Sequence, residues 1–184
     1  MRDDEMNKVF HLNKDVYSIE INGVKINPQH LSNDIKINIT PRHCYCICLS
    51  NRCDDPELYR EFKADICIAF DVDELQERIR TIENKFKGML VVGRDVTYYK
   101  NGVHPNTLDP LELVFFKPEL FSHEAEYRIA LFYPLDKKGF KSSKGTIPFY
   151  KDGESMHMFL SHAKKEFITS CIIDVFSPKS MMNA

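Results

Sequence analysis

The sequence contains no long apolar run. No stretch of it approaches the roughly 18–20 consecutive apolar residues that a transmembrane helix needs. Four of the first five residues, MRDDE, are charged, and no apolar segment follows them, so no secretory signal peptide is expected. We therefore expect the protein to stay in the cytoplasm of the cell that makes it.

The sequence also has no excess of positive charge. It carries 25 Lys and Arg against 27 Asp and Glu, a formal net charge of −2, with a pI near 6.4. Proteins that bind nucleic acid or anionic membranes without specificity usually carry a clear basic surplus. Nucleic acid and membrane are therefore not expected partners.

Motifs that mark several common enzyme classes are absent. There is no glycine-rich phosphate loop, no serine nucleophile elbow, no His-Glu-x-x-His pair and no kinase signature. The cysteine and histidine spacings do not match a zinc finger or zinc ribbon, which need paired ligands at short intervals. We therefore expect no metal site of those types.

What is present is typical of one globular domain. The chain has 184 residues, of which 43% are hydrophobic and 28% charged, values near the averages for folded domains. We predict a single domain over residues 1–184, with loose ends at 1–8 and 178–184.

The apolar pattern predicts an α+β fold with mostly antiparallel, twisted sheets. Asn22-Gly23 separates two short β-forming runs and predicts a hairpin. Apolar residues at helical spacing predict two main helices, over 73–87 and 155–167. Residues 43–49 have little polar alternation and predict a strand buried on both faces, and Gly93 within a strand suggests a bulge or bend. Further strands are expected over 16–21, 24–26, 34–40, 66–70, 89–99, 126–133, 147–150 and 172–176.

Three of the six cysteines alternate along one predicted strand. Cys44, Cys46 and Cys48 would place their sulfur atoms on the same face. One interpretation is that they are small apolar residues packed on a buried strand face. The alternative is a metal or thiolate site.

The segment from 115 to 129 gathers the most polar groups next to an apolar run. Strand alternation places Glu124, Glu126 and Arg128 on one side, with Lys117 near in sequence. Two carboxylates at the mouth of a strand could orient a ribose, act as a general base or stabilise a developing cation. The alternative is an ion-pair network with a purely structural role.

Two further positions are candidates for ligand binding. Ser50 and Arg52 follow the predicted strand that ends at Leu49, and polar loops after strands often bind ligands. Tyr98 ends another strand and could stack on a flat ligand, or it could cap the core.

Two stretches of this sequence resemble a known group of proteins. They are 46–50 (CICLS) followed by 62–70 (FKADICIAF), and Phe116-Lys117 with 124–129 (EAEYRI). They are similar to uncharacterised bacterial and phage proteins, some of whose relatives stand beside abortive-infection (AbiGi-like) phage-defence genes. The resemblance spans about residues 40–133.

Glu124-x-Glu126 is also similar to the Glu-x-Glu motif of mono-ADP-ribosyltransferases. That resemblance implies that Glu126 holds the nicotinamide ribose and stabilises an oxocarbenium-like transition state, while Glu124 activates the acceptor. Leu49-Ser50 is similar to the end of the serine-containing strand in that family. NAD is the cofactor that this resemblance implies.

Two functions remain open from the sequence. One is an effector in phage–bacterium conflict that handles NAD or another nucleotide. The other is a non-catalytic binding module, such as an antitoxin, an inhibitor or a ligand sensor, whose partner is a small nucleotide or a protein. A catalytic Glu126 should face a cleft with an arginine or aromatic wall, whereas a binding module should show Glu124 and Glu126 paired with basic residues and no cleft.

Overall fold

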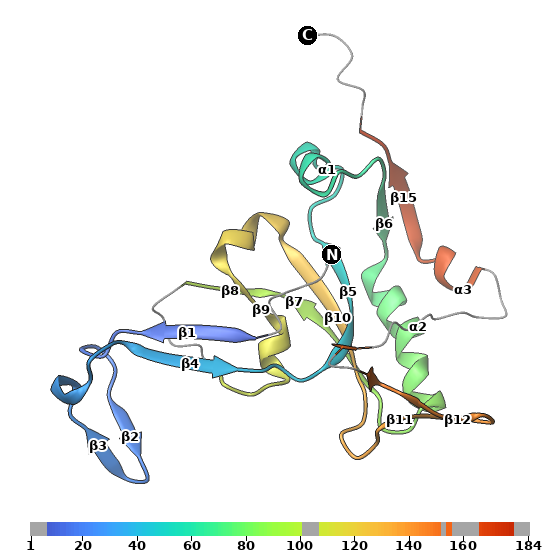
Figure 1. The fold of residues 1–184 in the computed structure, drawn as a ribbon. Helices are drawn as coiled ribbons and strands as arrows, with labels where there is room; N and C mark the ends of the chain where they lie inside the picture. Colours follow the sequence, from blue (N-terminus) through green and yellow to red (C-terminus); the bar gives the residue numbers. More distant parts are fainter. Residues whose placement is uncertain (1–6, 101–106, 152–153, 156–165, 179–184) are drawn as a thin grey trace, which may run out of the picture. The chain divides into compact units, whose positions relative to one another are not determined.

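The computed structural model describes residues 7–100, 107–151, 154–155 and 166–178 (Figure 1). These residues form helices and mostly antiparallel sheets, so the predicted α+β class is confirmed. They divide into two compact units, each built from two segments of the chain. Unit 1 takes residues 1–42 and 96–123, and unit 2 takes residues 43–95 and 124–184. Each unit is described by itself below.

Unit 1 consists of short strands around a small aromatic core. Its strands are β1 (Lys8–Leu12), β2 (Ile19–Ile21), β3 (Val24–Ile26), β4 (Ile35–Ile39), β8 (Thr97–Tyr99) and β9 (Phe116–Pro118). Strand β1 pairs with β4 and β2 with β3, both antiparallel, whereas β8 and β9 run parallel. Phe10, Leu113 and Phe116 are buried together at the centre.

The hairpin of β2 and β3 confirms the turn predicted from Asn22-Gly23. Both turn residues have positive φ, 51° at Asn22 and 81° at Gly23. A type I′ turn requires this conformation at both central positions, and its twist matches that of the flanking strands. Local sequence therefore determines this element.

Unit 2 holds the longest helix and the largest sheet. Its strands are β5 (Cys44–Ser50), β6 (Cys67–Phe70), β7 (Leu90–Asp95), β10 (Glu126–Phe132), β11 (Gly139–Ser142), β12 (Gly145–Pro148), β13 (Tyr150–Lys151), β14 (Glu154–Ser155) and β15 (Ile172–Phe176). Its helices are α1 (Pro56–Phe62), α2 (Val72–Lys85) and α3 (Glu166–Thr169). The three-stranded sheet has the order β5-β10-β7, with antiparallel neighbours. The other sheets of unit 2 are the antiparallel pairs β6–β15, β11–β12 and β13–β14.

Helix α2 covers one face of this sheet. It begins at the N-cap Asp71, whose carboxylate accepts a 2.9 Å hydrogen bond from the backbone N–H of Glu74. Leu75, Ile79 and Ile82 follow helical spacing and are buried against Ile129, Leu131 and Val91 of the sheet. Burying each such side chain contributes about 1.5–3 kcal/mol. The predicted helix over 73–87 is thus confirmed, although it begins at Val72 and ends at Lys85.

Strand β5 is not buried on both faces, contrary to the prediction. It lies at the edge of the sheet, and its exposure alternates: Cys46, Cys48 and Ser50 are exposed. The intervening residues Ile47 and Leu49 pack toward the core of α2 and the sheet. Cysteine counts as an apolar residue in a sequence pattern. The run 44–49 therefore looks continuously apolar, although its exposed and core-facing positions alternate.

Gly93 produces no bulge, which was one of the two features predicted there. The pairing of β7 with β10 runs in continuous register through Gly93, which lies opposite Ile129. A Cβ atom at this position would meet the Gln76 Oε1 atom at 1.7 Å and the Tyr127 hydroxyl at 2.8 Å. Glycine is required here because a side chain from α2 approaches the strand closely.

Most of the helix predicted over 155–167 falls outside the described residues. Of its two ends, Ser155 belongs to strand β14 and Glu166 begins the short helix α3. Residues 1–6 and 179–184 of the predicted loose ends are likewise outside the described residues, whereas Lys8 begins β1 and is buried. Among the described residues, no helix is long and apolar enough to cross a membrane.

Candidate functional site

The candidate site lies where the strands of the three-stranded sheet present polar residues at one end. Strand β5 ends there at Ser50, β7 ends at Asp95, and β10 begins at Glu126. The register places Ser50 directly opposite Glu126 and Tyr127 directly opposite Asp95. We call this group the polar end; it comprises Ser50, Asn51, Asp95, Glu124, Ala125 and Glu126.

Glu126 and Arg128 form a buried ion pair on one face of β10. The Arg128 Nε atom donates a hydrogen bond of 2.7 Å to Glu126 Oε1. Only 4% of Glu126 and 5% of Arg128 is exposed. Desolvation alone would lower the pKa of Arg128, but the hydrogen bond and the charge of Glu126 outweigh it and raise that pKa. Each charge therefore compensates the other.

Two exposed cysteines share this face with the ion pair. Cys48 lies directly opposite Arg128, and Cys46 lies opposite Ala130. Desolvation of the sulfur, and then its hydrogen bond to Glu126, raises the pKa of Cys48 to about 12. Both cysteines are protonated near neutral pH, since the contact with Cys44 and desolvation also raise the pKa of Cys46. A thiolate nucleophile is therefore not favoured at these positions.

The loop after β5 is tied to the residues that precede β10. The Ser50 hydroxyl donates to the backbone carbonyl of Glu124 at 2.7 Å and accepts from the backbone N–H of Arg52 at 3.0 Å. The backbone N–H of Asn51 donates to the carbonyl of Ala125 at 2.8 Å. The Asn51 side-chain amide donates to the Asp95 carboxylate at 2.7 Å. These contacts hold the polar end in one conformation.

Ala125 adopts a backbone conformation that non-glycine residues seldom take. Its φ is +42°, in the left-handed region that favours glycine. This turn separates Glu124 from the strand, so Glu124 closes the 3-10 helix Glu119–Glu124 and does not extend β10. The prediction that strand alternation puts Glu124 beside Glu126 and Arg128 is therefore wrong. Backbone strain of this kind is found at functional sites more often than elsewhere.

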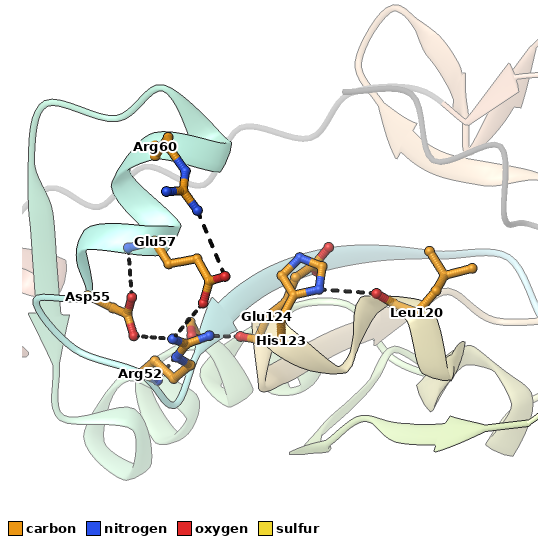
Figure 2. Close-up of polar contacts among 8 residues, drawn as sticks. Arg52, Asp55, Glu57, Arg60, Leu120, His123 and Glu124 are labelled. Atoms are coloured by element: carbon orange, nitrogen blue, oxygen red, sulfur yellow. Dashed lines mark hydrogen bonds and ion pairs between the residues drawn. The ribbon is translucent and has the colours of Figure 1, made fainter.

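Arg52 is engaged by acidic residues at the start of α1. Figure 2 shows its guanidinium between Asp55 and Glu57, with Nη2 lying 3.1 Å from Glu57 Oε2 and also paired with Asp55. Asp55 is at the same time the N-cap of α1, since its carboxylate accepts a 2.9 Å hydrogen bond from the backbone N–H of Glu57. Arg52 thus links the loop after β5 to this helix. The hydrogen bond to Glu57 is the main cause that raises its pKa.

Tyr98 and Lys117 belong to unit 1 and not to the polar end, which is in unit 2. They lie directly opposite each other on the parallel strands β8 and β9. The Lys117 ammonium lies 4.5 Å from the centroid of the Phe121 ring, a cation–π contact, and Lys117 is buried. The predicted site residues therefore form two groups: Tyr98 with Lys117, and Ser50 and Arg52 with Glu124, Glu126 and Arg128.

Asp95 is the member of the polar end that sequence reasoning missed. Ser50 was singled out because it is a polar residue at the end of a predicted strand, and Asp95 would have shown the same signal if its strand had been predicted to end there. The strand was expected to continue to Tyr99, which hid the strand end at Asp95. Within the described residues, no group of three or more His, Cys, Asp or Glu side chains is arranged to hold a metal ion.

Comparison with known proteins finds no relative. No protein-family model, no curated protein and no solved structure matches this chain. The polar end must therefore be interpreted from its own chemistry.

Proposed function

We propose that this protein is a non-catalytic binding module that uses the polar end to recognise a nucleotide. The observation that carries the proposal is the buried Glu126–Arg128 ion pair. A carboxylate that acts as a base, or that stabilises a developing cation, must reach the reacting atoms. The carboxylate of Glu126 instead accepts a hydrogen bond from a cation on its own strand, so we assign it a structural role.

The class of ligand follows from the hydrogen-bonding groups at the polar end. The Asp95 carboxylate is exposed and the Glu124 carboxylate is half-exposed, and carboxylates only accept hydrogen bonds when ionised. Their natural complements are ligands that present several hydroxyl donors. The vicinal hydroxyls of a ribose are such donors, which favours a nucleotide over an anion such as free phosphate.

The rigidity of the polar end supports binding. Ser50 and Asn51 donate hydrogen bonds to Glu124, Ala125 and Asp95. The loop after β5 and the turn before β10 are therefore ordered before a ligand binds. Preorganisation of this kind lowers the entropy lost on binding. In the setting that the resemblance to phage-defence neighbours implies, such a module would serve as an antitoxin, an inhibitor or a ligand sensor.

An enzyme that handles NAD is the second candidate, and one observation favours it. Ser50 lies directly opposite Glu126 in the sheet, which joins the two segments that are similar to mono-ADP-ribosyltransferases. In that reading Glu126 would have to release Arg128 and turn to the nicotinamide ribose, with Glu124 next to the acceptor. The binding module needs no such rearrangement.

NAD titration by calorimetry tests both candidates. The proteins are the wild type, Glu124→Gln and, as a matched control, Glu61→Gln on the exposed face of α1. We expect saturable binding that Glu124→Gln weakens by about tenfold, the effect of losing one hydrogen bond to a charged group, and that Glu61→Gln leaves unchanged. A parallel assay follows the release of nicotinamide from NAD.

Each outcome separates the candidates. Binding without nicotinamide release supports the module, whereas release that Glu124→Gln abolishes supports the transferase. If millimolar NAD gives no heat with the wild type, NAD is removed from both candidates. The binding module is then tested with other ribonucleotides. If none of them gives a heat of binding, the nucleotide proposal is overturned.

A further inference from the structure

Three thiols form a row along the exposed side of the edge strand β5. Cys44 is half-buried, and Cys46 and Cys48 are exposed, with none of them in a disulfide. The sulfur atoms of Cys44 and Cys46 are in contact at 3.4 Å. The exposure of Cys46 and Cys48 argues against the interpretation that all three cysteines pack as small apolar residues on a buried face. The row needs another explanation.

We propose that Cys44 and Cys46 together bind a soft monovalent cation, with Cu(I) as the natural ion. Thiolates select Cu(I) over harder metals, and Cu(I) is satisfied by two of them. Zinc requires four ligands in a structural site and three in a catalytic one. The described residues offer no cluster of three or more donors, so the two-thiol arrangement selects against zinc.

The strand geometry suits two-coordinate binding. Residues two apart on a strand have Cα atoms about 6.7 Å apart and side chains on the same face. With metal–sulfur bonds of about 2.3 Å, a linear S–M–S unit spans about 4.6 Å. The sulfur atoms must therefore separate by about 1 Å from their 3.4 Å contact. A change in the χ1 angle of the exposed Cys46 supplies this movement without disturbing the backbone.

Binding of Cu(I) at this pair is coupled to the release of protons. Each thiol loses its proton to solvent when it coordinates, so Cu⁺ and two thiols give a bis-thiolate complex of charge −1 and two protons. Arg128 lies opposite Cys48, the next member of the row, and is itself paired with Glu126.

The test is an anaerobic competition between the full chain and the chromogenic Cu(I) chelator bicinchoninate. We expect the wild type to withdraw one equivalent of Cu(I) from the chelator. Cys46→Ser should weaken this binding by more than the roughly 10–100-fold that the loss of a supporting residue costs at a metal site. Cys44→Ser should have the same effect, and thermal melts of both variants show whether they are folded.

Cys53→Ser is the matched control. Cys53 is an exposed thiol of the same unit that lies within hydrogen-bonding reach of Cys67, so it offers a competing thiol pair. Cu(I) binding retained in Cys53→Ser and lost in Cys46→Ser supports the proposal. Loss in Cys53→Ser alone, no binding by the wild type, or displacement of Cu(I) by equimolar zinc overturns it.

Discussion

Arg128 donates from its Nε atom to the Glu126 carboxylate at 2.7 Å, and both side chains are almost completely buried. A charge that is removed from water loses several kcal/mol of solvation unless a partner compensates it. Here each residue is the partner of the other, two positions apart on one strand face. The two residues therefore stabilise the fold only as a pair. A substitution of one member lowers the free energy of unfolding, because the other charge stays buried.

Glu126→Gln should destabilise the fold, because it removes the carboxylate that pairs with the buried charge of Arg128. We expect the free energy of unfolding to fall by about 3 kcal/mol, the lower end of the range for breaking a buried pair. The measurement is urea denaturation followed by circular dichroism. Glu124→Gln, outside the strand and half-exposed, is the control and should change stability by less than about 0.5 kcal/mol.

Replacing the whole pair gives an independent check. Glu126→Leu combined with Arg128→Met removes both buried charges at similar volume, and such replacements are often neutral or stabilising. We expect the double variant to be more stable than Glu126→Gln. Equal melting temperatures for wild type and Glu126→Gln would instead mean that the carboxylate is free to act on a ligand.

Gly93→Ala should destabilise the protein through Gln76 and Tyr127. The new Cβ would lie 1.7 Å from Gln76 Oε1, so Gln76 must rotate away. That rotation breaks the 2.9 Å hydrogen bond that the Tyr127 hydroxyl donates to Gln76. We expect a loss of about 1 kcal/mol in the free energy of unfolding, the typical net value of one hydrogen bond.

A double-mutant cycle tests this explanation. In a Gln76→Ala background the nearest obstructing atom and the hydrogen bond are both gone, and only the Tyr127 hydroxyl at 2.8 Å must still move, so Gly93→Ala should cost less there than in the wild type. Equal costs in both backgrounds would show that Gly93 is required for another reason, such as a backbone conformation that alanine disfavours.

Alkaline pH should destabilise the region around α1 through Tyr59. Desolvation, and then its 3.1 Å hydrogen bond to Asp54, raises the pKa of Tyr59 to about 12, above its ordinary value near 10. Because the folded pKa is the higher one, the stabilisation is fully present below about pH 10 and is lost as the pH rises toward about 12. Tyrosinate absorbance and thermal melts across this range measure both effects.

Tyr59→Phe is the comparison for this pH dependence. It lacks the titrating hydroxyl, so its melting temperature should decline less between pH 10 and 12 than that of the wild type. Tyr17→Phe, which changes a half-exposed tyrosine of unit 1, should leave the wild-type slope intact. The same slope in all three proteins would place the alkaline transition elsewhere.

Elements with local signals could be predicted from the sequence. Asn22-Gly23 fixes its hairpin because both positions need positive φ, and α2 follows from its N-cap Asp71 and its apolar spacing. The pairing of Glu126 with Arg128 followed from strand alternation. In each case the determining residues are neighbours along the chain.

Features that depend on tertiary pairing could not be predicted in this way. The residue types at 44–50 do not determine whether the strand lies at the edge or at the centre of a sheet. Asp95 joins Asn51 only because β5 and β7 flank β10. Gly93 is compatible with a bulge or with close approach of another side chain, and the choice depends on where Gln76 of α2 lies.

Ala125→Gly should stabilise the protein, and the sign follows from two opposing effects. A left-handed conformation costs a non-glycine residue about 1–2 kcal/mol, and Ala125 has φ +42°. Glycine removes that cost but loses about 0.4–1 kcal/mol through the greater freedom of the unfolded chain. The first effect is larger, so we expect a net gain of about 0.5 kcal/mol in urea denaturation.

Ala64→Gly is the matched control for the strain at Ala125. Ala64 is half-buried after α1 and does not have positive φ, so glycine there should only lose stability. If the turn at Ala125 instead shapes the polar end for its ligand, Ala125→Gly will gain stability while nucleotide binding weakens, because glycine lets Glu124 and Asn51 move apart. A loss of stability in Ala125→Gly equal to that in Ala64→Gly would contradict the assignment of strain at this turn.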